Sequence, residues 1–346
     1  MKDIRNYNLV NNNTFGISEE CRRFVEPTTV EELKEVLRTL TEADQPLLII
    51  GGGSNLLLTK RYEGTVLRSA IKGIEQITAC DGHAEGLPDD CQLVRCGSGT
   101  TFDDVVEYCV SNGLYGAENL SIIPGDVGAS AVQNIGAYGV EAKDIIYRIE
   151  AVDVQTGEDV VIFPDECQYG YRQSRFKGEW KGRYVITYVT YRLSRTFTPH
   201  LDYGNIRAEL ERRDITKPTA QDVRDVIISI RNEKLPDPKV EGNAGSFFMN
   251  PIVERPVFEA LQQQYPQMPH YFVDSEHEKV PAGWLIDQCG WKGVTCGSVG
   301  VHPKQALVLV NKGGATGQDI VRLSDDIRAD VRRKFGVEIH PEVNFV

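Results

Sequence analysis

The sequence lacks the long apolar run that a membrane-spanning helix needs. No segment of the 346 residues approaches the roughly 20 consecutive apolar side chains that cross a bilayer. The first eight residues, MKDIRNYN, also lack the apolar segment of a secretory signal. We therefore expect a cytoplasmic protein that does not insert into a membrane.

Basic charge is scarce as well. Lysine and arginine total 38 against 50 aspartate and glutamate residues, which gives a formal charge of −12, and no basic run occurs. Proteins that grip a nucleic-acid backbone need a basic surface, so we exclude nucleic acid as a partner. A few basic groups in one cleft can still attract a small anionic ligand.

The sequence has no CxxC pair and no cysteine–histidine spacing typical of a metal site. Its eight cysteines are scattered along the chain. In a chain of this length they are typical of reduced thiols that fill the core of a cytoplasmic protein, and we expect no metal.

What is present is an ordinary globular mixture, 41% apolar and 25% charged, long enough for two or three domains. Capping signals and apolar spacing predict helices after Thr29, from 219 to before Pro236, and over about 318–334. Alternation predicts a hairpin over 145–163 and a strand over 184–193. These elements favour the α+β class, with mixed sheets in more than one domain.

One glycine loop, Gly51-Gly52-Gly53-Ser54-Asn55, follows an apolar strand as a phosphate-binding loop would. Leu56 stands where a dinucleotide fold has its third glycine, and neither a helix nor a Walker lysine follows. Taken alone, the loop is better explained as a tight connection between two strands.

A second cluster of small residues runs from Gly116 to Gly139, and we expect neither a regular helix nor a strand to hold so many of them. Glycine permits close approach of the backbone either to another backbone or to a ligand, and the sequence leaves both open. Two such loops in one half of the chain favour a large, phosphate-bearing cofactor.

Four segments in one order make the sequence resemble the UDP-N-acetylenolpyruvoylglucosamine reductase family, in its longer type I branch. The likeness extends from Asn13 to Glu342. The four segments are Gly51 to Asn55, Pro124 to Gly139, Gly170-Tyr171-Arg172-Gln173-Ser174-Arg175-Phe176-Lys177, and Gly242-Asn243-Ala244-Gly245-Ser246-Phe247-Phe248.

The resemblance implies non-covalent FAD in a fold resembling vanillyl-alcohol oxidase, with two FAD-binding subdomains and a smaller α+β substrate domain. It places them at 1–68, 69–200 and 201–335, with the tail from about 336 to 346 packed back near the first. The implied reaction uses NADPH to reduce a UDP-sugar enolpyruvyl ether to UDP-N-acetylmuramate. That step belongs to peptidoglycan precursor synthesis, and so to cell-wall biogenesis, cell shape and cell division. We expect a monomer.

The resemblance also implies which residues contact the cofactor. No histidine lies in either glycine loop, which fits a flavin without a histidyl bond. The implied cofactor-binding residues are Gly51, Gly52, Gly53, Ser54, Asn55, Pro124, Gly125, Ser130, Asn134, Ile135, Gly136 and Ala137.

Three residues match the family's catalytic groups. Arg172 and Glu342 are implied to stabilise the charge that develops when hydride adds to the alkene, and Ser246 to donate the proton. Without the family, Arg172 is better explained as a surface arginine, Glu342 as a solvated carboxylate in a fraying tail, and Ser246 equally well as a turn residue. The resemblance requires all three to converge on one flavin edge.

Six further residues match substrate contacts of the family. Tyr203 corresponds to a tyrosine on a mobile loop that covers the diphosphate in the type I branch, and Lys234 also suits the C-terminal end of a helix on structural grounds alone. The implied substrate-binding residues are Tyr171, Tyr203, Lys234, Asn250, Tyr271 and Gln305.

The chain departs from the family at two positions. Met249 stands where lysine is usual and Asn344 where arginine is common, so two cations are missing. Two other functions remain open at this point: a flavin oxidase of the same cofactor fold acting on another sugar or alcohol, and a non-catalytic sugar-nucleotide binder.

Overall fold

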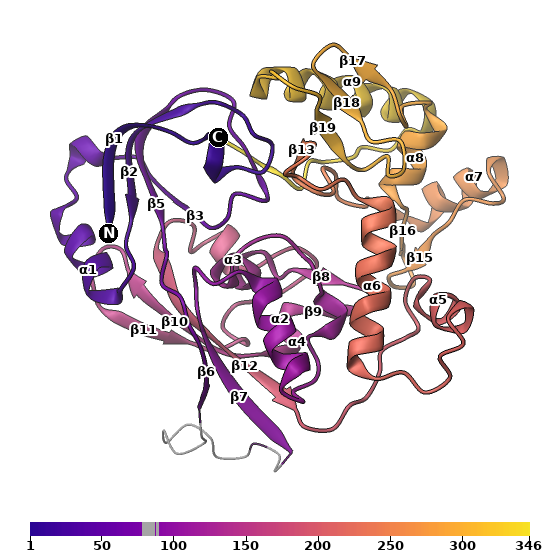
Figure 1. Cartoon of the computed structure of the whole chain (residues 1–346). Coiled ribbons are helices and arrows are strands. Elements are labelled where there is room, and N and C mark those ends of the chain that lie inside the picture. Colours follow the sequence, from indigo (N-terminus) through magenta and orange to yellow (C-terminus); the bar gives the residue numbers. More distant parts are fainter. Residues whose placement is uncertain (78–86, 88–89) are drawn as a thin grey trace. The chain divides into compact units, whose positions relative to one another are not determined.

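The computed structural model describes residues 1–77, 87 and 90–346. Within these residues the chain forms two compact units (Figure 1). The first comprises residues 1–7, 21–52 and 62–231, and the second residues 8–20, 53–61 and 232–346. The three-part division implied by the resemblance remains a prediction.

The first unit opens with a four-stranded sheet in the order β1-β2-β5-β3, in which β2 and β3 run parallel to β5. Helix α1 packs on it through Leu33, Val36 and Leu37. The predicted cap is confirmed, because the Thr29 hydroxyl accepts a hydrogen bond from the Glu32 amide at 3.1 Å. The elements are β1 (Lys2–Asn8), β2 (Glu20–Glu26), α1 (Val30–Thr39), β3 (Leu47–Ile50) and β5 (Tyr62–Arg68).

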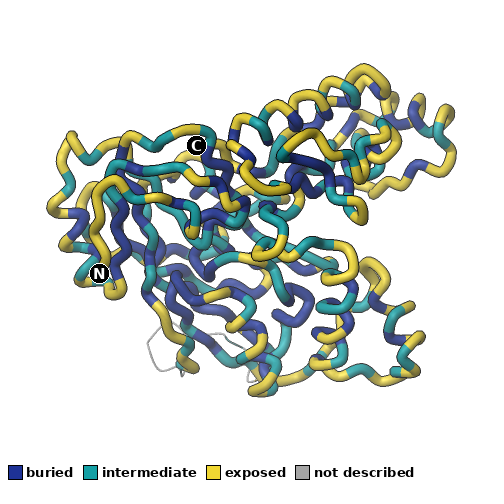
Figure 2. The backbone as a smooth tube through the Cα atoms, turned by 45° about the horizontal axis from the view of Figure 1, so that its top comes forward, coloured by how far each residue is buried: buried dark blue, intermediate teal, exposed yellow. Residues whose placement is uncertain are grey.

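A five-stranded antiparallel sheet, in the order β11-β10-β12-β7-β6, forms the centre of the same unit. The predicted hairpin is the β10–β11 pair, and the predicted strand is β12, which is mostly buried (Figure 2). Helices α2 and α3 pack against this sheet in one apolar core. The elements are β6 (Ile74–Ile77), β7 (Cys91–Gly97), α2 (Phe102–Ser111), α3 (Val127–Gln133), β8 (Gly136–Ala137), β9 (Val140–Glu141), α4 (Ala142–Ile145), β10 (Ile146–Asp153), β11 (Asp159–Ile162) and β12 (Tyr184–Ser194).

The expectation that the small-residue stretch would hold neither a regular helix nor a strand was wrong. Residues Val127–Gln133 form α3, and two short strands, β8 and β9, follow it. Small residues serve close packing here, because a Cβ at Gly128 would lie only 3.0 Å from the Ser98 Cβ. The helix ends where Asn134 takes a left-handed conformation, with φ of 47°.

Two helices complete the first unit. Thr219 and Asp222 cap the N-terminal end of α6 as predicted, with the Thr219 amide donating to Asp222 Oδ2 at 2.8 Å. A bidentate ion pair, 2.7 and 2.9 Å, joins Arg224 of α6 to Asp103 of α2. The helices are α5 (Ile206–Arg212) and α6 (Ala220–Lys234), whose last three residues belong to the second unit.

The second unit contains a four-stranded sheet, order β13-β19-β18-β17, a three-stranded sheet, order β14-β16-β15, and a short parallel pair, β4–β20. The predicted C-terminal helix is α9, which ends at left-handed Gly336. The elements are β4 (Leu56–Leu57), β13 (Gly242–Asn243), β14 (Ile252–Glu254), α7 (Arg255–Gln264), β15 (Tyr271–Phe272), β16 (His277–Lys279), α8 (Ala282–Gln288), β17 (Thr295–Cys296), β18 (Val299–Val301), β19 (Leu309–Asn311), α9 (Gly317–Phe335) and β20 (Asn344–Phe345).

Helices and strands in both units confirm the α+β class. Seven cysteines are free, four of them buried, while Cys80 lies outside the described residues. None of the helices in the described part of the chain combines the length and the apolarity that crossing a membrane requires.

Candidate active site

The first unit brings the two glycine segments together. Gly51 and Gly52 follow β3, and a Cβ on Gly51 would lie 3.0 Å from the Ala129 Cβ. A Cβ on Gly52 would lie 3.2 Å from Asp126 Oδ1. The Gly51 loop therefore packs closely against the second glycine segment, which was one of the two possibilities that the sequence left open. The same cradle suits an extended phosphate-bearing cofactor, because its glycines allow close approach to the loop backbone and successive N–H groups can hold phosphate oxygens.

Arg68 is a charged residue of this region that the sequence reasoning missed. It ends β5, opposite Ile50 at the end of β3, and its guanidinium contacts Asp126 at 3.2 Å and Glu26 at 3.3 Å. Its Nε atom is buried and has no hydrogen-bond partner among the described residues. An arginine at the carboxyl end of a parallel strand, beside a glycine loop, was the available signal, since ligands bind α/β sheets at that edge.

Asp126, which belongs to the second glycine segment and faces Gly52, is buried. Burial raises the pKa of its carboxyl, and the Arg68 guanidinium and, more weakly, Lys72 act in the opposite direction. Arg68 is the cation in direct contact with this carboxylate.

The side chains of two predicted cofactor-binding residues form hydrogen bonds within the protein. The Ser130 hydroxyl donates to the Val127 carbonyl at 2.7 Å and shares a hydrogen bond with Tyr191. The Asn134 side chain, which is fully buried, bonds to Gly170 and Glu141. Both residues therefore support the backbone at the end of α3, whatever they contribute to a ligand.

Arg172 lies in a tight turn closed by two backbone hydrogen bonds of 3.1 Å between Gly170 and Gln173. Its φ of 55° is left-handed, which costs a branched or long side chain about 1 kcal/mol or more. The guanidinium donates from Nη2 to the Gly136 carbonyl at 2.8 Å. A strained backbone and a fixed side chain are typical of a functional arginine. Arg172 is not an ordinary solvated surface residue.

Around Arg172 the first unit gathers two tyrosines and a second arginine. A Cβ on Gly139 would lie 3.5 Å from the Tyr203 Cβ, and one on Gly204 would lie 3.3 Å from the Tyr138 ring. Burial and the neighbouring Arg172 charge lower the pKa of Arg231, while Tyr138 raises it. Arg231 was not singled out from the sequence, although it stands three residues before Lys234 in the same helix.

The second unit brings the Ser246 and Glu342 segments together. The Glu342 amide donates to the Phe247 carbonyl at 2.8 Å, and Phe248 forms a β-bridge with Pro341. Ser246 is exposed, whereas Phe247 and Phe248 on its C-terminal side are buried. This pattern holds the backbone and leaves the hydroxyl at the surface of the unit. The tail at Glu342 is anchored rather than frayed.

Of the two departures from the family pattern, Asn344 has a structural role through its side chain, which donates to the Asn55 carbonyl at 3.1 Å where β20 pairs with β4. The Met249 backbone amide donates to the His340 carbonyl at 3.0 Å, a bond that does not depend on the methionine side chain. Asn344 therefore ties the tail to the predicted cofactor loop residue Asn55.

Two of the predicted substrate residues contact the start of α8. Asn250 Oδ1 accepts a hydrogen bond from the Ala282 amide at 3.0 Å. A Cβ on Gly283 would lie 3.1 Å from Gln305 Oε1. The first two residues of this helix therefore contact both Asn250 and Gln305, although 55 positions separate these two in the chain.

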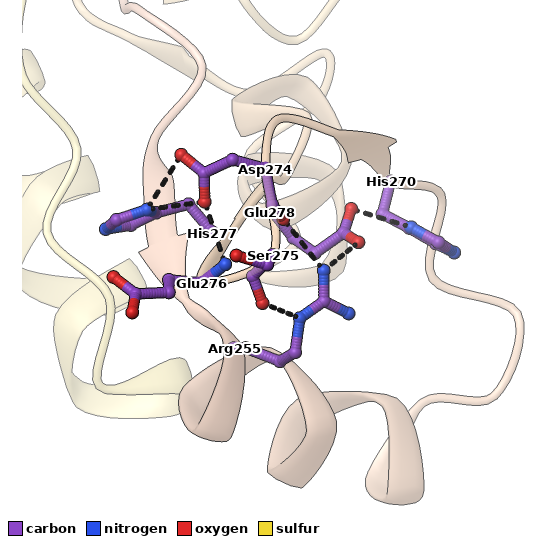
Figure 3. A network of polar contacts seen from close by, with 7 residues as sticks. All are labelled: Arg255, His270, Asp274, Ser275, Glu276, His277 and Glu278. Carbon is purple, nitrogen blue, oxygen red and sulfur yellow. Dashed lines mark hydrogen bonds and ion pairs between the residues drawn. The ribbon is translucent and has the colours of Figure 1, made fainter.

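Tyr271, another predicted substrate residue, is exposed on β15, where it lies over Lys279. A polar network around the buried Glu278 supports this small sheet (Figure 3). Glu278 of β16 binds Arg255 at 3.1 Å and His270 at 3.2 Å, and Arg255 also donates to the Ser275 carbonyl at 2.7 Å. The network fixes the turn between β15 and β16 and so the strand that carries Tyr271.

The remaining predicted residues are placed as follows. Tyr171 packs beside the Arg172 guanidinium, 5.6 Å from ring centroid to Cζ. Lys234 is the last residue of α6. No cluster of three or more metal-ligating side chains occurs among the residues that the structure describes.

Two protein-family models match parts of this chain. A family model described as FAD binding domain matches residues 21–162, which contain the Gly51 loop, Arg68 and α3. A second model, described as UDP-N-acetylenolpyruvoylglucosamine reductase, C-terminal domain, matches residues 237–346, which contain Ser246 and Glu342. The chain therefore carries an FAD-binding domain.

Relatives that match almost the whole chain then show the family to which it belongs. UDP-N-acetylenolpyruvoylglucosamine reductase of Bacteroides fragilis is 55% identical over 98% of this chain and 99% of its own. The reductase of the same name from Pseudomonas aeruginosa is 47% identical over 96% and 95%. The solved structure of UDP-N-acetylenolpyruvylglucosamine reductase from Thermus caldophilus has the same fold, with a TM-score of 0.65 at 22% identity, and covers 99% of this chain and 98% of that one.

The chain belongs to the UDP-N-acetylenolpyruvoylglucosamine reductase family. The resemblance inferred from the four segments is confirmed, and with it an FAD-dependent oxidoreductase of peptidoglycan synthesis. Nothing in these comparisons favours a flavin oxidase or a non-catalytic sugar-nucleotide binder.

Proposed function

We propose that this protein uses NADPH to reduce the enolpyruvyl ether of UDP-N-acetylenolpyruvoylglucosamine to the lactyl ether of UDP-N-acetylmuramate. We further propose that it acts as a cytoplasmic monomer. Its seven free cysteines are in keeping with a reducing compartment.

When bound, FAD would supply the chemistry of hydride transfer from NADPH to the enolpyruvyl group. The residues that would hold it are the two glycine segments, with Arg68 as an additional cation. The Gly51 loop and the start of α3 offer closely packed backbone, which fits an extended diphosphate.

Arg172 and Glu342 are proposed to control charge on the substrate. Hydride addition to one alkene carbon places negative charge on the other carbon and on the attached carboxylate. A planar guanidinium can bind that carboxylate through two parallel hydrogen bonds, which a lysine cannot do. The observation that carries this proposal is the strained, clamped state of Arg172, with φ of 55° and its Nη2 2.8 Å from the Gly136 carbonyl.

Ser246 is proposed to complete the reaction by giving its proton to the carbon that carries the negative charge. Its exposed position between buried anchors would let a substrate reach the hydroxyl without moving the backbone. A proton from solvent then restores the hydroxyl, so one hydride and one proton are added overall. A serine is a weak acid, so nearby positive charge must favour the deprotonated form.

The test is an anaerobic flavin spectrum followed by sequential additions. We expect NADPH to bleach the flavin bands and the enolpyruvyl UDP-sugar to restore them without oxygen. Restoration by air but not by the UDP-sugar would instead indicate a flavin oxidase. A purified protein that binds the UDP-sugar but has no flavin absorbance would indicate a non-catalytic binder.

A further inference from the structure

Asn134 occupies an unusual position in the first unit. Its side chain is completely buried, and its backbone is left-handed, with φ of 47°, at the C-terminal end of α3. Asparagine tolerates this conformation better than most residues, but the buried amide needs partners for both its oxygen and its nitrogen.

The partners fix the orientation of the amide. The Lys143 amide donates to Asn134 Oδ1 at 3.0 Å, and a backbone N–H can only donate. Nδ2 therefore faces the opposite side, where it donates to the Gly170 carbonyl at 3.0 Å and to Glu141 Oε2 at 3.0 Å. Glu141 is held in turn by Lys143, at 2.9 Å.

Gly170 is the first residue of the turn that carries Arg172, so Asn134 holds the base of that turn. The other end of Arg172 is held by the same segment, because its guanidinium donates to the Gly136 carbonyl at 2.8 Å and approaches the Asn134 carbonyl at 3.5 Å. One short stretch, 134–136, thus fixes both the backbone and the guanidinium of Arg172.

We propose that Asn134 is a positioning residue for Arg172: its side chain holds the Gly170–Gln173 turn, so that the left-handed Arg172 presents its guanidinium in one direction. This inference rests on the role proposed above for Arg172. It gives Asn134 a function distinct from the cofactor contact implied by its family resemblance.

The strain at Arg172 makes such a clamp necessary. A left-handed arginine relaxes to a right-handed or extended conformation unless its surroundings prevent it. The turn's own two backbone hydrogen bonds do not anchor it to the rest of the unit, and Lys177 Nζ, which donates to the Arg172 carbonyl at 2.8 Å, belongs to the same segment as the turn. The Asn134 amide joins the turn to the end of α3 in the buried interior. Loss of the amide should let the turn relax and displace the guanidinium.

The experiment compares Asn134→Gly with the parent holoenzyme. Glycine keeps the left-handed backbone without strain and removes only the amide. Stopped-flow spectroscopy measures flavin reduction by NADPH and reoxidation by the enolpyruvyl UDP-sugar separately. We expect reoxidation to slow by about 10- to 100-fold, since small displacements of a catalytic group cost this much. Because the Asn134 amide is bonded within the protein, any cofactor contact of this residue falls to its backbone, which glycine retains, so reoxidation should slow by at least about tenfold more than reduction.

A double-mutant cycle separates positioning from general damage. In an Arg172→Met background, Asn134→Gly should cause little further loss of reoxidation, because the group it positions is gone. Asn119→Ala is the matched control: Asn119 is also buried and donates to two carbonyls, Tyr138 and His200, at 2.9 Å each. Its effect should be the same in both backgrounds.

Asn134→Asp is the second variant, should the glycine variant fold poorly. It keeps the size of the side chain but places an oxygen against the Gly170 carbonyl and the Glu141 carboxylate. It should show the same coupling to Arg172.

The inference is overturned if Asn134→Gly and Arg172→Met act independently, if the Asn119 control couples to Arg172 equally, or if the Asn134 variants lose FAD instead of slowing reoxidation. If Arg172→Met alone leaves reoxidation unchanged, the proposed role of Arg172 fails and the inference fails with it. The single Arg172 variant therefore tells the two failures apart.

Discussion

Arg172 and Gly136 are joined by a 2.8 Å hydrogen bond from the guanidinium Nη2 to the carbonyl oxygen. A Cβ on Gly136 would lie 3.2 Å from Arg172 Nη1, so only glycine leaves full room for the guanidinium there. A residue predicted to contact the cofactor and a residue predicted to be catalytic are thus in direct contact within the first unit.

The first prediction is that Arg172→Lys retains a positive charge but loses the planar fork. We expect NADPH to reduce the flavin normally and reoxidation by substrate to fall by about 10²–10³-fold, the usual cost of removing one preorganised donor. Stopped-flow rates of the two half-reactions measure this. Arg175→Lys is the control, because Arg175 pairs with exposed Glu179 in the same segment. Equal losses in the two variants would contradict the role of Arg172.

The second prediction concerns Ser246→Ala. Removal of the hydroxyl takes away the proton donor but leaves the buried Phe247 and Phe248 anchors unchanged, so the fold and flavin reduction should be retained. Reoxidation should be nearly abolished. The rate that remains should no longer show the solvent isotope effect that proton transfer from the Ser246 hydroxyl causes in the parent protein. A variant that slows both half-reactions equally would show that Ser246 does not act at the proton-transfer step.

Local elements were the most predictable part of the structure. Thr29, Thr219 and Gly336 mark helix ends because capping depends on neighbouring residues in the sequence. The stretch up to Gly139 failed as a local prediction because its small residues reflect packing of α3 against Ser98, a contact between distant segments. Periodicity carries no information about such approaches.

The candidate site was predictable only through the family resemblance. The sequence alone favours a solvated tail for Glu342, and the bond from its amide to Phe247 arises from a bridge between segments almost 100 residues apart. Arg231 was missed for the same reason, because an isolated arginine within a helix has no distinctive pattern until its neighbours are known. Arg68 carried a signal at the end of its strand, but that signal depends on the pairing of β5 with β3, which brings it beside the glycine loop.

The third prediction is that Arg255→Met destabilises the protein by about 3–5 kcal/mol, because it leaves Glu278 as a buried carboxylate without its guanidinium. The Glu278 side chain is only 5% exposed. Chemical denaturation measures the loss, and adding Glu278→Gln to Arg255→Met should recover part of it. Arg322→Met removes an exposed ion pair with Asp319 on α9 and should cost less than about 0.5 kcal/mol. Similar losses in Arg255→Met and Arg322→Met would contradict the importance of burial.

The fourth prediction concerns pH. Arg23 binds Asp3 at 2.7 Å and Asp44 at 2.9 Å. The hydrogen bond from Arg23 lowers the pKa of Asp3, and the Thr41 amide, helped by Arg23, lowers the pKa of Asp44. Depressed carboxyl pKa values stabilise the folded state above the ordinary value of about 4, and this stabilisation is lost as the pH falls through the folded-state pKa.

Arg23→Met should therefore lower the free energy of unfolding at pH 7 by about 1 kcal/mol, because these groups are partly exposed. The melting temperature should fall accordingly. The difference from the parent protein should shrink as the pH falls below about 4 and vanish only once the pH lies below the lowered pKa values of Asp3 and Asp44 in the folded parent. Thermal unfolding across this range is the measurement. A difference that stays constant with pH would mean that Arg23 acts through packing alone.

The last prediction uses the thiols as probes of the core. Burial raises the pKa of Cys109 to about 12 and that of Cys167 to about 11, so almost no thiolate exists at neutral pH, and Cys21 and Cys96 are equally buried. Among the seven described cysteines, an alkylating reagent under native conditions should modify exposed Cys296 first and leave these four unmodified until the protein unfolds. Peptide mass mapping identifies each modified site. Rapid native modification of Cys96 or Cys109 would show that the core between α2 and β7 opens, because that core is what keeps these two thiols from the reagent.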